Sequence, residues 1–238
     1  MERRNLSYYV MEIQELGKHI SGMNHRRPLS EWSSKKQRSS LVIDTLCDGV
    51  KGDNAAVAYV YCDYTIQKEQ SARSVLGAVL RQVIRVLARV PDEVREAFEH
   101  AKRQVDGCGP LLDEIQEMLV VSLPHLEKAF ICIDALDEFQ KFRPEQWDGL
   151  WGSLQHVVRE CPNTRLFLTG RPQIRADVEK YFPKEANMVM VEATSDDVGR
   201  YIEKRLKEDL HSDAMNKELR ADILRVVPEK VSGMCVYS

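Results

Sequence analysis

Apolar and polar positions along this chain fall into two alternating patterns. Four short runs are almost continuously apolar, which is typical of strands buried on both faces of a sheet: residues 55–61, 130–133, 165–169 and 187–191. Between them, apolar residues recur at spacings of three and four, which predicts helices. Strands that alternate with helices predict an α/β fold with a mostly parallel sheet flanked by helices and right-handed crossovers.

The helical patterns can be bounded by their breakers and caps. A helix starts at Ser39 and closes at Gly49 and Gly52, and the strongest pattern, over 71–90, stops before Pro91. The remaining predicted helices cover residues 92–105, 111–123, 145–159, 174–181, 195–206 and 214–231.

Residues 1–38 do not follow this alternation. A possible amphipathic segment covers 8–20, and a basic, Ser-rich stretch after it is expected to be loop. A strand over Tyr8–Ile13 is an alternative, which its register with the helix starting at Ser39 disfavours.

Composition narrows the class of protein. The chain has 238 residues, of which 43% are hydrophobic and 30% charged, and it is long enough to form one large or two small globular domains. The net charge is -3, although residues 1–38 carry eight Lys/Arg against four Asp/Glu. That basic cluster lacks interleaved aromatic residues, which argues against a nucleic-acid partner. No apolar run approaches a membrane span and no signal peptide is visible, so we expect a soluble, cytoplasmic protein without a membrane partner.

The cysteines give no metal or disulfide pattern. The six are far apart, with no CxxC pair, and Cys132 lies inside a predicted strand, so we expect a reduced core residue. Trp147 and Trp151 lie four apart and are expected to pack in the core or an interface. No Ser/His/Asp or Cys/His constellation is readable.

Acidic residues follow the apolar run 130–133. Asp134, Asp137 and Glu138 come at its carboxyl end, where open α/β sheets bind their ligands. An apolar strand that ends in an aspartate is the Walker B arrangement, in which the carboxylate holds Mg²⁺ beside nucleotide phosphates. The alternative is an acidic, solvated turn or helix N-terminus, where carboxylates are favourable in any case.

Several segments, in order, resemble one family. They are SSLVIDTL (39–46), VAYVYCDYTIQKEQSARSVLGAVLRQVI (57–84), FICIDALDEF (130–139), RLFLTGRP (165–172), ATSDDVGRYIEKRL (193–206) and VVPEKVSGM (226–234). Together they resemble the NACHT domain of STAND-type signal-transduction P-loop NTPases, NLR-like proteins, in the form found in filamentous fungi.

The resemblance implies an AAA+-like P-loop NTPase core that switches with ATP or GTP and Mg²⁺. It implies that Asp134 associates with Mg²⁺, and that Asp137 and Glu138 orient or activate water. Arg171 matches the arginine of the family's Thr-Ser-Arg-Pro, here Thr-Gly-Arg-Pro, and would stabilise phosphate charge.

The phosphate loop departs from the family. Such a loop needs glycines, a lysine and a Ser/Thr hydroxyl at a helix N-terminus. Counted back from Ser39, the family's Gly-Lys-Thr falls on residues 34–36, which read Ser-Lys-Lys, so that only Lys35 agrees. The apolar strand before the loop is missing too, because residues 20–32 contain Pro28 and several polar residues, and the sheet is expected to lack its middle strand.

These patterns divide the chain into three expected parts. Residues 1–38 form an atypical segment that is poorly structured or replaces the phosphate loop, 39–192 form the NACHT-like core, and 193–238 start a truncated helical extension. The expected function is a NACHT-type nucleotide-binding regulatory module with an impaired phosphate loop and weak or no hydrolysis. The alternative is a nucleotide-independent scaffold. Expected partners are other NACHT-bearing chains, or effector and repeat domains of a longer protein.

Overall fold

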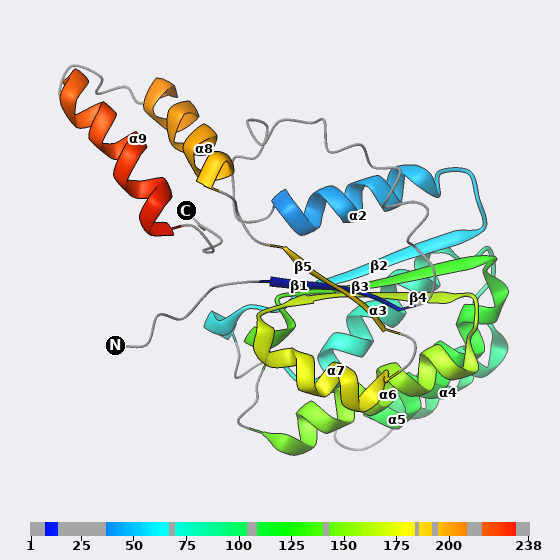
Figure 1. The fold of residues 1–238 in the computed structure, drawn as a ribbon. Helices are drawn as coiled ribbons and strands as arrows, with labels where there is room; N and C mark the ends of the chain where they lie inside the picture. Colours follow the sequence, from blue (N-terminus) through cyan, green and yellow to red (C-terminus); the bar gives the residue numbers. More distant parts are fainter. Residues whose placement is uncertain are drawn as a thin grey trace.

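The structure, a computed structural model, places a five-stranded sheet between helices on both faces (Figure 1). It describes residues 8–13, 37–66, 70–103, 109–139, 143–183, 186–191, 195–208 and 216–231. The predicted α/β class, with a mostly parallel sheet flanked by helices, is confirmed.

The sheet has the strand order β2-β3-β4-β1-β5. Its strands are β1 Tyr8–Ile13, β2 Ala55–Tyr61, β3 Lys128–Asp134, β4 Thr164–Gly170 and β5 Ala186–Val191. β2, β3 and β4 are parallel neighbours, so that Ile131 of β3 lies between Ala58 of β2 and Leu166 of β4. Their carboxyl ends therefore meet at one edge of the sheet.

Strand β1 overturns an expectation. It pairs antiparallel with β4 and with β5, and Met11 lies between Leu168 and Met188. The expectation that the sheet lacks its middle strand is therefore wrong, and the disfavoured strand interpretation of this segment is correct. The aromatic and β-branched residues of β1 suit a strand, and two neighbouring strands are available to pair with it. The phosphate-loop positions, Lys35 among them, lie outside the described residues.

The helices follow the predicted patterns closely. They are α2 Gln37–Gly49, α3 Ala72–Val86, α4 Asp92–Arg103, α5 Leu112–Ser122, α6 Pro144–Glu160, α7 Arg175–Tyr181, α8 Ser195–Glu208 and α9 Lys217–Val231. Helix α3 begins with a reciprocal cap between Ser71 and Ser74. It ends at Val86, four residues before the predicted end, because Leu87 already has extended backbone.

The core lies on both sides of the sheet (Figure 1). A large cluster joins β2, β3 and β4 to α3, α5, α6 and α7, and it includes Trp147 and Trp151, as predicted. A smaller cluster under α2 joins Ile43, Cys132 and Phe167. Cys132 is a free, buried cysteine, and burial raises the pKa of its thiol to about 12, so the thiol is protonated at neutral pH.

Helices α8 and α9 pack against each other and lie beside the sheet rather than on it (Figure 1). Pro228 lies inside α9. None of the helices in the described ranges is long and apolar enough to cross a membrane.

Candidate functional site

Strand β3 carries Asp134 to the carboxyl edge of the sheet. Residues 129–133 before it are buried, and Asp134 itself is half-buried. The chain then turns at Ala135, whose backbone is left-handed (φ 53°, ψ 43°), a conformation that is uncommon for a residue other than glycine. This turn leads directly into a short 3-10 helix, η4 (Leu136–Glu138), which carries Asp137 and Glu138.

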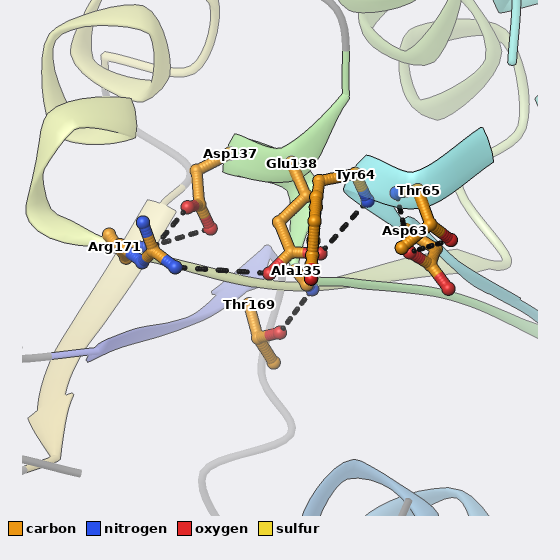
Figure 2. A network of polar contacts seen from close by, with 8 residues as sticks. All are labelled: Asp63, Tyr64, Thr65, Ala135, Asp137, Glu138, Thr169 and Arg171. Carbon is orange, nitrogen blue, oxygen red and sulfur yellow. Dashed lines mark hydrogen bonds and ion pairs between the residues drawn. The ribbon is translucent and has the colours of Figure 1, made fainter. Parts of the chain in front are cut away.

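Thr169, near the end of β4, binds the end of β3 in two ways. Its hydroxyl donates a short hydrogen bond to Oδ1 of Asp134. Its Oγ1 also accepts the backbone N–H of Ala135 at 3.0 Å (Figure 2). The Thr169 side chain is buried, so both bonds are shielded from water. Thr169 therefore fixes the orientation of the Asp134 carboxylate and supports the left-handed turn after it.

Asp137 holds Arg171, the first residue after β4. The Asp137 side chain is only 2% exposed, and its Oδ1 accepts the backbone N–H of Arg171 at 3.0 Å. Its Oδ2 lies 3.4 Å from Nε of the same arginine (Figure 2). A buried carboxylate needs such partners, so this pair ties η4 to the end of β4.

Glu138 joins three strand ends. Its Oε2 accepts the backbone N–H of Tyr64, which follows β2, at 3.2 Å, and its Oε1 lies 3.9 Å from Nη2 of Arg171 (Figure 2). Burial raises the pKa of Glu138, and the negative charges of Asp137 and Asp63 act in the same direction. The Tyr64 bond and the Arg171 charge oppose the rise without cancelling it.

Asp63 adds a further carboxylate at the end of β2. Its Oδ1 accepts the backbone N–H of Thr65 at 2.8 Å and the Thr65 hydroxyl at 2.7 Å (Figure 2). These bonds order the loop that supplies the Tyr64 N–H to Glu138.

Gly170 lies between Thr169 and Arg171, where the resembling family has serine. A Cβ at this position would lie 2.7 Å from Cδ1 of Ile174 and 3.3 Å from Oδ1 of Asp137. Ile174 is fully buried, so a larger residue would have to displace a packed side chain. Glycine thus lets β4 end close against η4.

Of the five expected site residues, the structure brings Asp137, Glu138 and Arg171 into contact and places Asp134 at the same sheet edge, bound to Thr169. The fifth, Lys35, is not among the described residues. Thr169 belongs to the site but was not among the residues expected from the sequence. Its place near the end of a strand parallel to β3 was the feature of the sequence that could have indicated it. Asp63 is another addition, marked in the sequence only by its position just after β2.

The donor set at this edge suits a hard divalent cation in part. Asp134 supplies a carboxylate whose orientation is fixed, and Asp63, Asp137 and Glu138 add carboxylates at the same edge of the sheet. Oxygen ligands of this kind are what Mg²⁺ prefers, and it commonly keeps several waters. Within the described ranges no group of three His, Cys, Asp or Glu side chains has the geometry to hold a metal ion.

One family model matches the chain. It is described as nephrocystin 3, N-terminal, and it covers residues 33–171, more than half of the sequence. The chain belongs to the nephrocystin 3 N-terminal family. Comparison with curated proteins and with solved structures gave no match.

The matched part of this nephrocystin 3 N-terminal family member contains most of the site. It runs from just before α2 through β2, β3 and β4 and ends at Arg171, so it includes Asp134, Asp137, Glu138 and Thr169. The family is NACHT-like. This agrees loosely with the resemblance of the sequence to a NACHT-type domain.

Proposed function

We propose that this chain is a NACHT-type nucleotide-binding regulatory module, an ATP- or GTP-dependent signalling switch with an impaired phosphate loop. One observation carries the proposal. Asp134, Asp137 and Glu138 lie with Thr169 and Arg171 at the carboxyl edge of three parallel strands. That edge is where α/β sheets bind their ligands.

In this proposal each residue has a distinct role. Asp134, oriented by Thr169, holds Mg²⁺ directly or through water. Bound Mg²⁺ would supply positive charge against the nucleotide phosphates. Glu138 accepts a proton more readily than an ordinary glutamate because its pKa is raised, which suits a group that orients or deprotonates water.

Arg171 supplies the cation for phosphate. Its side chain is 38% exposed, while Asp137 and Glu138 lie 3.4 Å and 3.9 Å from guanidinium nitrogens. A phosphate must therefore compete with two carboxylates for this side chain. The competition makes the arginine a sensor, since its partners change with the charge present at the edge.

The phosphate loop limits hydrolysis in the proposed switch. Lys35 is the residue proposed to face the phosphates, but its neighbours Ser34 and Lys36 stand where the family has glycine and threonine. Fewer backbone donors would surround the transferred phosphate. We expect weak binding with slow or absent hydrolysis.

A fluorescent-nucleotide titration tests the proposal. Labelled ATP and GTP are titrated with Mg²⁺ and with a chelator against the wild type, Asp134→Ala and Lys35→Ala. Thr169→Val controls for loss of the Asp134 hydrogen bond. Asp48→Ala controls for loss of a carboxylate elsewhere, because Asp48 is an exposed aspartate on α2 that pairs with Lys51 just beyond the helix. We expect nucleotide binding that depends on Mg²⁺. Asp134→Ala and Lys35→Ala should abolish this binding, and Asp48→Ala should leave it unchanged. Equal binding in Asp134→Ala would overturn the assignment.

A nucleotide-independent scaffold is the second candidate. Two observations favour it: the glycine-poor sequence at 34–36, and the engagement of Arg171 by both acids. Its partners would be other NACHT-bearing chains, or effector and repeat domains of a longer cytoplasmic protein. Association with such a partner that is equally tight with and without Mg²⁺-nucleotide would favour the scaffold over the switch.

A further inference from the structure

Strand β2 is an edge strand of the described sheet, and its own sequence contains none of the residues that commonly block such an edge. The order β2-β3-β4-β1-β5 leaves one side of β2 without a neighbour among the described strands. Natural edge strands are blunted by lysine, proline or bulges, because free N–H and C=O groups invite pairing. The seven residues of β2, AAVAYVY, contain no proline and no Lys, Arg, Asp or Glu.

The groups that point outward can be identified from hydrogen bonds. Cys62 donates its N–H to the Asp134 carbonyl at 2.9 Å, and the Asn54 carbonyl accepts the Glu127 N–H at 2.8 Å, so even-numbered residues face β3. Successive residues of a strand alternate their backbone groups between its two edges. The N–H and C=O groups of Ala55, Val57, Tyr59 and Tyr61 therefore point away from β3.

One side chain occupies the middle of this outer edge. Gln82 of α3 accepts the Tyr59 N–H on Oε1 at 3.1 Å, and its Nε2 donates to the Tyr59 carbonyl at 2.8 Å. The second hydrogen of Nε2 is used by the Ala78 carbonyl of the same helix, at 3.1 Å. The Gln82 amide thus binds both backbone groups of Tyr59, as one residue of an antiparallel strand would.

A second glutamine repeats the arrangement more weakly beyond the strand. Gln70 accepts the N–H of Asp63, the next outward-facing residue after Tyr61, at 3.4 Å. The side-chain bonds at this edge thus come from glutamines that flank α3 or lie on it, not from another strand.

We propose that Gln82 is an edge guard: it keeps β2 from pairing, and in its absence β2 pairs with β2 of a second copy of this chain. This proposal is independent of the proposed nucleotide switch. An uncharged strand brings no like charges together when two copies meet antiparallel about a two-fold axis. Tyr59 is 41% exposed, which leaves its ring available to a partner strand's tyrosine.

Variants test the guard by sedimentation at increasing protein concentration. Gln82→Ala should self-associate at least about tenfold more tightly than the wild type, since removing a competitor that makes two hydrogen bonds is worth about a decade in affinity. The matched control is Gln146→Ala. Gln146 also accepts a backbone N–H, that of Ala72 at 3.1 Å, but away from this edge, so this variant should sediment like the wild type.

A second-site change identifies the surface. Tyr59→Pro in the Gln82→Ala background removes an outward N–H that the β2–β3 ladder does not use, so association should fall back to the wild-type level. Two results would overturn the proposal: association that survives this proline, or a Gln82→Ala variant that is as monomeric as the Gln146→Ala control.

Hydrogen exchange on the unmodified chain tests the same edge without any variant. The Tyr59 amide should be protected by Gln82, while the outward-facing Val57 amide should exchange much faster. Equal protection of the two amides would show that another segment covers this edge, and would contradict a guard role for Gln82.

Discussion

The contact between Asp137 and Arg171 predicts an asymmetry between its two partners. The Asp137 side chain is 2% exposed and that of Arg171 is 38% exposed. Removing the arginine side chain leaves a buried carboxylate short of one charged partner, whereas removing the acid leaves an arginine whose side chain is partly exposed to water. The two single substitutions should therefore differ in cost although they break the same ion pair.

The expected magnitudes follow from these exposures. Breaking a fully buried pair costs about 3–5 kcal/mol, and partial exposure of Arg171 lowers this to about 2–3 kcal/mol for Arg171→Met. In Asp137→Asn the amide oxygen can still accept the Arg171 N–H, which lies 3.0 Å from the native Oδ1. We expect about 1 kcal/mol for that variant, typical of one partly solvated interaction.

Urea unfolding at pH 7, followed by circular dichroism, measures both costs. For slopes of about 2 kcal/mol/M, Arg171→Met should lower the midpoint by about 1 M and Asp137→Asn by about half as much. Arg175→Met, which removes an exposed arginine paired with Glu179 one turn later, is the matched control and should change the midpoint very little. Equal losses for the two site variants, or a larger loss for Asp137→Asn, would refute the reasoning.

Three further predictions concern neighbouring groups. Thr169→Val should cost about 1–3 kcal/mol of unfolding free energy, because it strips the Asp134 carboxylate and the Ala135 N–H of a buried partner, and Thr169→Ser should restore most of it. The raised pKa of Glu138 means that the folded state holds its proton more tightly than the unfolded chain does. This contribution is full below the ordinary glutamate pKa and is lost as pH rises through the raised value. Glu138→Gln should therefore raise the urea midpoint at pH 7 but not at pH 4, and an equal effect at both would contradict the shift. Cys132, whose pKa burial raises to about 12, should resist alkylation in the native protein at pH 8 and react fully in urea; rapid native labelling would show that its strand opens.

The three parallel strands could be predicted because each is a local signal. β2, β3 and β4 are near-continuous apolar runs. β3 ends in Asp134 and β4 is followed directly by Arg171, and the edge of a parallel sheet brings these two positions together. Their proximity follows from topology alone, since carboxyl ends of parallel strands meet. The grouping of the acidic residues with the arginine could therefore be predicted from the sequence alone.

The remaining features depend on partners far away in the sequence. β1 is a strand between β4 and β5, which lie more than 150 residues later, and no local spacing reveals such pairing. The bond from Thr169 to Asp134 depends on the register of two strands, and that from Gln82 to Tyr59 on how α3 crosses the edge of β2. The absence of room for a Cβ at Gly170 likewise comes from Ile174 packing back on the strand.

The most direct measurement is a calorimetric titration of Mg²⁺-ATP into the purified wild-type chain, repeated with Mg²⁺-GTP. We predict saturable heat with a dissociation constant in the micromolar range for at least one nucleotide, and its loss when Mg²⁺ is chelated. No saturable heat with either nucleotide, from a chain that circular dichroism shows to be folded, would contradict the nucleotide-binding role of the Asp134 edge.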